Sequence, residues 1–148
     1  MTPKVRGADR EPVRDLRELR RKGKGSAADF HLLFDALEAF ARPRGPLAGD
    51  VARTPDLHVA FESDAGETLA CVRIRRGKVV RGPHAESAST RVILGPLAAR
   101  QALLGHPAGV LSEAYFDGRA KVEGRVRDLM ELLNLLESLN ARLNGEGK

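Results

Sequence analysis

The segment from Arg125 to Leu143 carries more large apolar side chains than one narrow face of a helix can hold. Burying them is favourable, and leaving them exposed would invite association. We therefore predict a helix that packs on a sheet with one side and meets a second apolar object with the rest. Three partners could cover the apolar surface that the sheet leaves open at residues 126–143: a bound acyl chain, a partner subunit or a second copy of the chain. The side chains are Val126, Leu129, Met130, Leu132, Leu133, Leu135, Leu136, Leu139 and Leu143.

Between residues 57 and 94 the apolar residues alternate with polar ones, which is the period of a β-strand. Strands are predicted over 57–62, 70–75, 78–81 and 90–94, separated by turns at 63–66, at Gly77 and at 82–84. Short turns between successive strands are typical of an antiparallel meander. The sequence thus predicts a meander with one buried face and one face rich in arginine and lysine.

Helical patterns lie on either side of these strands. A capping-box start at Ser26 precedes a stripe of Phe30, Leu33, Phe34, Leu37 and Phe40, which ends before Pro43. Further short helices are predicted over 96–104 and 108–116, and a fifth short strand over 119–123. The fold class we predict is α+β, with a curved antiparallel sheet of about five strands covered on one face by helices.

The length and composition favour a single domain. The chain has 148 residues, a formal net charge of +5 and one cysteine, so it has no intrachain disulfide. No apolar run reaches the length of about 18 residues that a membrane span needs, and no secretory signal is visible. We expect a cytoplasmic protein whose positive charge favours anionic partners.

Residues 1–25 differ from the rest of the chain. Nine lysines or arginines and four acids lie between Lys4 and Lys24, with few apolar residues. We predict a basic, disordered tail over 1–25 and a folded domain over 26–148, while residues 12–22 have the spacing of a short amphipathic helix. Such a segment would attach to anionic headgroups or RNA. The membrane contacts that we predict are Arg17, Arg20, Arg21 and Lys22, with Arg73 and Arg75 of the sheet.

The residue pattern contains no catalytic motif that we recognise. The four histidines are scattered, Cys71 stands alone in a strand pattern, and neither a phosphate-binding loop nor a GxSxG elbow is present. We therefore predict a binding protein, with no enzymatic activity, no metal and no cofactor. Nucleic acid stays an alternative ligand through the basic tail, although the aromatic residues fall in apolar patterns rather than among basic ones.

In its order of helices and strands the chain resembles the sterol carrier protein type 2 (SCP2) domain over about residues 28–143. The local match is strongest in Tyr115-Phe116-Asp117-Gly118-Arg119-Ala120-Lys121-Val122-Glu123-Gly124, and Thr90-Arg91-Val92-Ile93-Leu94-Gly95-Pro96 is similar to the family's last meander strand. This resemblance implies a domain that holds an acyl chain or a sterol-like molecule between its sheet and its helices.

A narrower resemblance is to the N-terminal lipid-binding segment of cyclopropane-fatty-acyl-phospholipid synthases. Ser112-Glu113-Ala114-Tyr115-Phe116-Asp117-Gly118, with Val122-Glu123-Gly124 and Asp128-Leu129, carries it. Arg119, Lys121 and Arg127 depart from it, because that segment is often acidic there. The chain has no glycine motif for S-adenosylmethionine, so no catalytic residue is carried over.

We therefore expect a protein that binds a lipid or fatty acyl chain without covalent chemistry, and that presents it to a separate enzyme. An accessory subunit of a cyclopropane-synthase-like methyltransferase and a basic nucleic-acid-binding protein are the alternatives. The pocket lining that we predict is Phe34, Leu37, Phe61, Ile74, Leu104, Leu111, Tyr115, Phe116, Met130 and Leu133.

Overall fold

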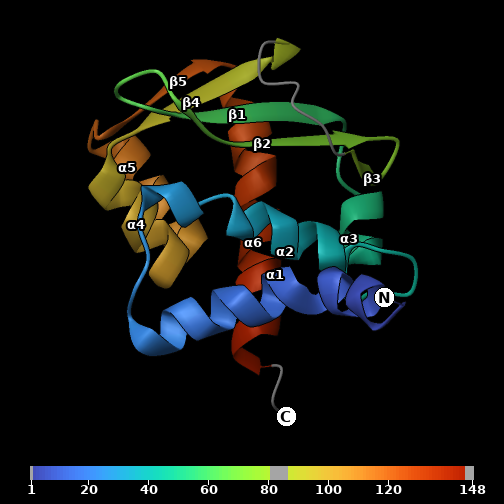
Figure 1. The fold of residues 1–148 in the computed structure, drawn as a ribbon. Coiled ribbons are helices and arrows are strands. Elements are labelled where there is room, and N and C mark those ends of the chain that lie inside the picture. The colour runs from blue at the N-terminus through green and yellow to red at the C-terminus, as the bar shows by residue number, and fades with distance from the viewer. Residues whose placement is uncertain (1, 81–86, 146–148) are drawn as a thin grey trace.

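A computed structural model describes residues 2–80 and 87–145 (Figure 1). A five-stranded sheet lies on one side of the molecule and helices cover one of its faces. The strands are β1 (Leu57–Ser63), β2 (Thr68–Arg75), β3 (Lys78–Val80), β4 (Thr90–Leu94) and β5 (Ala120–Gly124). The helices are α1 (Thr2–Lys22), the short 3₁₀ helix η1 (Ala27–Asp29), α2 (Leu32–Phe40), α3 (Ala48–Ala52), α4 (Pro96–Leu104), α5 (Pro107–Phe116) and α6 (Val126–Gly145). The α+β class is as predicted.

The strand order corrects the predicted meander. The order is β3-β2-β1-β4-β5, and β4 lies beside β1 and parallel to it, with Phe61 opposite Val92. The other three pairs are antiparallel. Alternating apolar residues show which face of a strand is buried but not which strand lies beside it. β1 is buried on both faces over its first five residues, and its central place leaves neither of its edges exposed.

Three phenylalanines pack together where α2 covers the sheet. Phe30 precedes α2, Phe34 lies within it and Phe61 lies in β1, and all three are buried. Their ring centroids are 5.1–5.6 Å apart, in edge-to-face and stacked arrangements. This aromatic trio joins α2 to the sheet, as the stripe in the sequence predicted.

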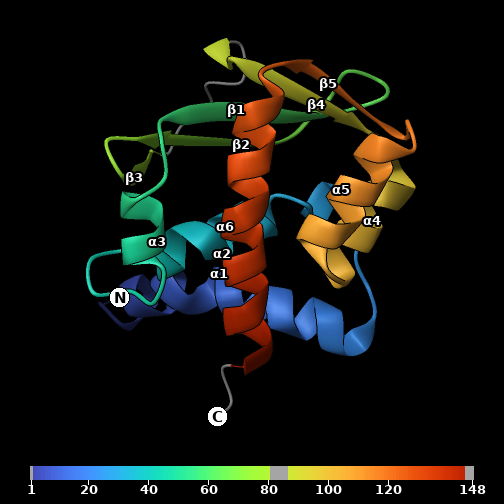
Figure 2. The same cartoon turned by 180° about the vertical axis from the view of Figure 1, so that it is seen from behind.

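The wide apolar surface predicted for the last helix is covered by other elements of the same chain. α6 runs down from the sheet, in front of α1 and α2 in the view of Figure 2, with α3 on one side and the α4–α5 pair on the other. It also contacts α2, β1 and β4. Seven of its nine large apolar side chains are buried, and Val126 and Met130 are half-buried. The wide stripe thus needs no partner subunit, which corrects the inference drawn from residues 126–143.

A helix replaces the disordered tail that we predicted over residues 1–25. α1 lies across α2 on the side away from the sheet (Figure 1), and Val13 and Leu16 of α1 are buried. The carbonyl oxygens of Gly23 and Gly25, which follow α1, accept hydrogen bonds from Arg100 of α4. The apolar spacing within 12–22 was visible in the sequence, but an isolated helix of this length is marginal. Packing on α2 and α4 supplies the stability that the segment lacks alone.

A buried carboxylate joins the start of α6 to the start of β4. Asp128 is 6% exposed, and its Oδ2 accepts hydrogen bonds from Ser89 Oγ at 3.0 Å and Thr90 Oγ1 at 3.1 Å. The Thr90 hydroxyl accepts a further bond from the backbone N–H of Arg125. A negative charge in the first turn of a helix is favourable because the helix dipole is positive there. Asp128 therefore fixes where α6 leaves the sheet.

Replacing Leu16 by alanine tests whether α1 is packed. Because Leu16 is fully buried, we expect Leu16→Ala to lower the free energy of unfolding by about 3 kcal/mol. The exposed neighbour Asp15 is the matched control, and Asp15→Ala should change it by less than about 0.5 kcal/mol. Urea unfolding followed by circular dichroism measures both, since the chain has no tryptophan. Equal stability of the two variants would mean that α1 is detached.

Replacing Asp128 tests the junction of β4 and α6. Asp128→Ala removes the acceptor of two hydroxyl hydrogen bonds, so we expect a loss of about 2 kcal/mol in the free energy of unfolding. Arg127 is exposed on the same turn, and Arg127→Ala should leave the stability within about 0.5 kcal/mol of the parent protein. A neutral Asp128→Ala would contradict the anchoring role.

Candidate functional site

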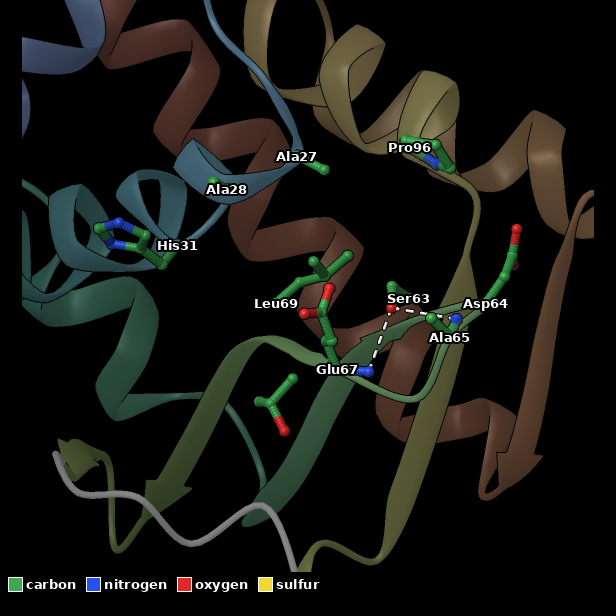
Figure 3. A pocket seen from close by; sticks show the side chains of 10 residues that line it. Ala27, Ala28, His31, Ser63, Asp64, Ala65, Glu67, Leu69 and Pro96 are labelled. Atoms are coloured by element: carbon green, nitrogen blue, oxygen red, sulfur yellow. Dashed lines mark hydrogen bonds between the residues drawn. The ribbon is translucent and has the colours of Figure 1, made fainter.

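A hollow of about 600 Å³ lies where η1, the turn between β1 and β2 and the start of α4 meet (Figure 3). Segments from three distant parts of the sequence form it, and α4 and η1 also pack directly on each other. Leu69 and Ala27 of its lining are half-buried and pack against the hydrophobic core. The lining consists of Ala27, Ala28, His31, Ser63, Asp64, Ala65, Glu67, Thr68, Leu69 and Pro96.

The turn between β1 and β2 is held by one hydroxyl. Ser63 Oγ accepts hydrogen bonds from the backbone N–H groups of Ala65 at 3.2 Å and Glu67 at 3.1 Å, as Figure 3 shows. Gly66 has a φ of +89°, a conformation that glycine adopts without strain. This side of the hollow is therefore a fixed turn, and the Ser63 hydroxyl is occupied by the backbone.

The opposite side of the hollow is built by η1. Ser26 and Asp29 form a reciprocal capping box, in which each side chain accepts a backbone hydrogen bond at the start of the helix. Ala28 and His31 of the lining flank Phe30, and Ser63 follows Phe61 by two residues. The chain positions that line the hollow thus adjoin the aromatic trio of the core.

The polar side chains of the lining lie at the rim of the hollow. His31 is half exposed, and its Nδ1 lies 2.7 Å from Asp35 Oδ2, so its ring is engaged with α2. An added Cβ at Gly95 would lie 3.4 Å from Asp64 Oδ2, which places that carboxylate beside the start of α4. The geometry offers a small, mixed cavity with apolar groups inside and carboxylates at the edge. It favours binding over covalent chemistry.

Comparison with known proteins gives a match in three-dimensional structure. No family model matches the chain, and no curated protein is similar to it in sequence. A solved structure titled "UbiJ-SCP2 Ubiquinone synthesis protein" superposes with a TM-score of 0.54, at 16% sequence identity, over 77% of this chain and 90% of that one. The chain has an SCP2-like fold. The similarity to cyclopropane synthases is not tested by this match and stays a prediction.

The SCP2-like fold brings together eight of the ten side chains that we predicted to line a pocket. Six are buried in one core, and Leu104 and Met130 pack against it. Ile74 also lines a hollow at the other end of the sheet, and the other nine line none of the three hollows described by the structure. The six buried side chains are Phe34, Leu37, Phe61, Ile74, Leu111 and Leu133.

Tyr115 and Phe116 lie outside that core at the end of α5. Tyr115 is half-buried against Phe116, with ring centroids 5.2 Å apart, and Phe116 is 75% exposed. Leu97, which follows Pro96 of the hollow, is 62% exposed. Because two residues connect α4 to α5 and the helices pack together, Leu97 and Phe116 lie toward the same end of the pair. Two large apolar side chains thus face solvent toward the end of the helix pair that adjoins the hollow.

The predicted membrane contacts divide into two groups. Arg21, Lys22 and Arg75 are exposed, while Arg17 and Arg73 are half-buried. Arg20 points inward: its Nε donates to Leu103 O at 3.0 Å and its Nη1 to Asn140 Oδ1 at 2.7 Å. Burial lowers the pKa of the Arg20 guanidinium from its ordinary value. Arg20 therefore joins α1 to α4 and α6 and is not available to a membrane surface.

The hollow itself was missed by sequence reasoning. Its small residues and turn residues were recognised as a turn at 63–66 and a helix start at Pro96, but no pattern in the sequence brings them together with η1. Over residues 2–80 and 87–145, no helix has the length and hydropathy needed to cross a membrane, and no group of three or more metal-binding side chains is found.

Proposed function

We propose that this SCP2-like domain binds the apolar chain of a lipid or fatty acyl compound without catalysing a reaction, and presents it to a separate enzyme. The observation that carries the proposal is the SCP2-like fold combined with a hollow whose inner residues pack against an apolar core. The 16% identity establishes the fold alone, so the ligand is inferred from the chemistry of this chain.

The apolar side chains in and beside the hollow favour binding of an apolar chain. Apolar surface gains about 25 cal/mol for each Å² removed from water, and a chain seated against Leu69, Ala27 and Pro96 would be shielded by the β1–β2 turn. The buried core residues that lie close to the lining in sequence are Phe30, Phe61, Ala70 and Leu94. A longer ligand would have to displace side chains of this core, such as Phe34 or Leu133, which were predicted to line it.

The exposed apolar residues suggest how such a ligand arrives. Leu97 and Phe116 lie toward the end of the α4–α5 pair that adjoins the hollow, where they would contact the hydrocarbon surface that supplies a lipid. Asp117 and Glu113 near Phe116 are paired with Arg119, so this end carries little excess charge. Contact there would depend on apolar surface rather than on attraction to anionic lipids.

The structural neighbour is named as a protein of ubiquinone synthesis. By analogy, we propose that this chain serves an enzyme acting on a membrane-derived lipid. The methyltransferase subunit predicted from the second resemblance is a special case of this role, and residues 126–143 would not be its docking surface because α6 is already buried. Nucleic-acid binding has less support, because α1, the basic segment proposed to carry it, is packed on the domain.

Organic extraction of the purified protein tests the proposal directly. We expect mass spectrometry to find a lipid that co-purifies with the protein in a stoichiometric amount, because removing the apolar surface of the ligand from water favours the bound state. A protein that yields no lipid, and that does not take up a fluorescent fatty acid, would contradict lipid binding.

Replacing two exposed alanines by phenylalanine, one in the hollow and one outside it, tests where the ligand binds. Ala28 is exposed and lines the hollow, so Ala28→Phe should fill part of it and reduce fatty-acid uptake by about tenfold, which corresponds to about 1.4 kcal/mol. Ala141 is exposed on α6 and lines none of the described hollows, so Ala141→Phe is the matched control and should bind like the parent protein. If both variants take up the probe equally, the ligand does not occupy this hollow.

A further inference from the structure

A second hollow, of about 370 Å³, lies at the opposite end of the sheet from the first one. The first hollow includes the end of β1 and the start of β2, whereas the second includes the start of β1 and the end of β2. Its lining includes three arginines, Arg73, Arg75 and Arg125, together with Ser89 and the carboxylates of Asp56 and Asp128. Such a concentration of guanidinium groups has no role in the lipid binding proposed above.

The three arginines come from two parts of the fold. Arg73 and Arg75 are two residues apart on β2, so their side chains lie on the same face of the strand, about 7 Å apart along it. Arg125 lies between β5 and α6 and is exposed. The antiparallel register also sets Arg75 opposite Lys78 of β3. Like charges facing each other across two strands are destabilising, and a bound anion would relieve this repulsion.

Like Arg44, Arg76, Arg127 and Arg142, these three arginines have no carboxylate partner among the described residues, and they differ from those four in lining one hollow together. Arg53 pairs with Asp50, Arg119 with Asp117 and Arg91 with Glu62. Within residues 2–80 and 87–145, the side chains of Arg73, Arg75 and Arg125 make no such ion pair. Their donors are therefore open to an external acceptor.

The two aspartates of the lining are directed to other groups. Asp128 is buried and accepts from the Ser89 and Thr90 hydroxyls in the first turn of α6. Asp56 Oδ1 accepts from the backbone N–H of Arg76 at 2.9 Å. Each carboxylate has a donor of its own, and the positive end of the α6 dipole further offsets Asp128. The lining therefore holds three guanidinium groups against two carboxylates, of which Asp128 is buried, and it keeps an excess of positive charge.

We propose that this arginine hollow binds a phosphate group, either on a lipid headgroup or on a soluble phosphorylated compound. Guanidinium groups bind phosphate oxygens in pairs of parallel hydrogen bonds, and three of them match the several oxygens and the double charge of a phosphate monoester better than a single carboxylate. The site does not depend on the lipid-binding hollow, so either proposal can fail without the other.

Two matched variants on one helix turn test the site. Arg125→Gln removes a guanidinium from the hollow, whereas Arg127→Gln removes the same charge from an exposed position that does not line it. Inorganic phosphate is titrated calorimetrically, and vesicles of phosphatidylcholine with or without phosphatidic acid are tested by sedimentation. We expect Arg125→Gln to weaken binding of at least one of these probes by about tenfold or more, with Arg127→Gln close to the parent protein.

The outcomes separate the two sources. Arg125-dependent binding to phosphatidic-acid vesicles indicates a lipid headgroup, and Arg125-dependent binding of inorganic phosphate without vesicle binding indicates a soluble ligand. Equal losses in the two variants would show attraction by net charge alone and overturn the site. So would the absence of binding to every probe. Arg75→Gln, at an exposed strand end, replaces Arg125→Gln if the latter loses its circular dichroism spectrum.

Discussion

Burial of the leucines of α6 is the interaction on which the other elements depend. The helix leaves the sheet at Asp128 and passes between α3 and the α4–α5 pair, and its apolar side chains contact elements on several sides. α2, α3 and α5 are short, so packing on α6 and on their other neighbours stabilises them. The large apolar side chains of α6, seven of the nine buried, are therefore the common surface against which α2, α3, α5 and the sheet pack.

This arrangement also decides where ligands can bind. Buried side chains of the sheet and of α6, such as Phe61 and Leu132, belong to one apolar core, and two of the three hollows described by the structure lie at the ends of the sheet. One hollow is lined by residues of η1, the β1–β2 turn and α4, and the other by three arginines, two aspartates and residues of β1 and β2. Under the two proposals, an apolar chain and a phosphate group would therefore bind at opposite ends of the sheet.

Much of the fold was predictable because the relevant signals are local. The period of the apolar residues located the strands, the capping box at Ser26 marked η1, and Pro96 marked the start of α4. Two features were not predictable in this way. The parallel pairing of β1 with β4 depends on contacts between distant segments, and the docking of α1 depends on an apolar surface that exists only after α2 and α4 have folded.

The sequence by itself determined which faces of the helices and strands are apolar, and hence which residues enter the core. Eight of the ten side chains proposed for a pocket do meet one another there, because apolar periodicity reports burial. Only the tertiary structure decided that α6 is enclosed by its own chain, that Arg20 points inward, and that Arg73, Arg75 and Arg125 share a hollow. The physical reason is that periodicity describes one element at a time, whereas a binding site is formed by side chains from several elements that only folding brings together.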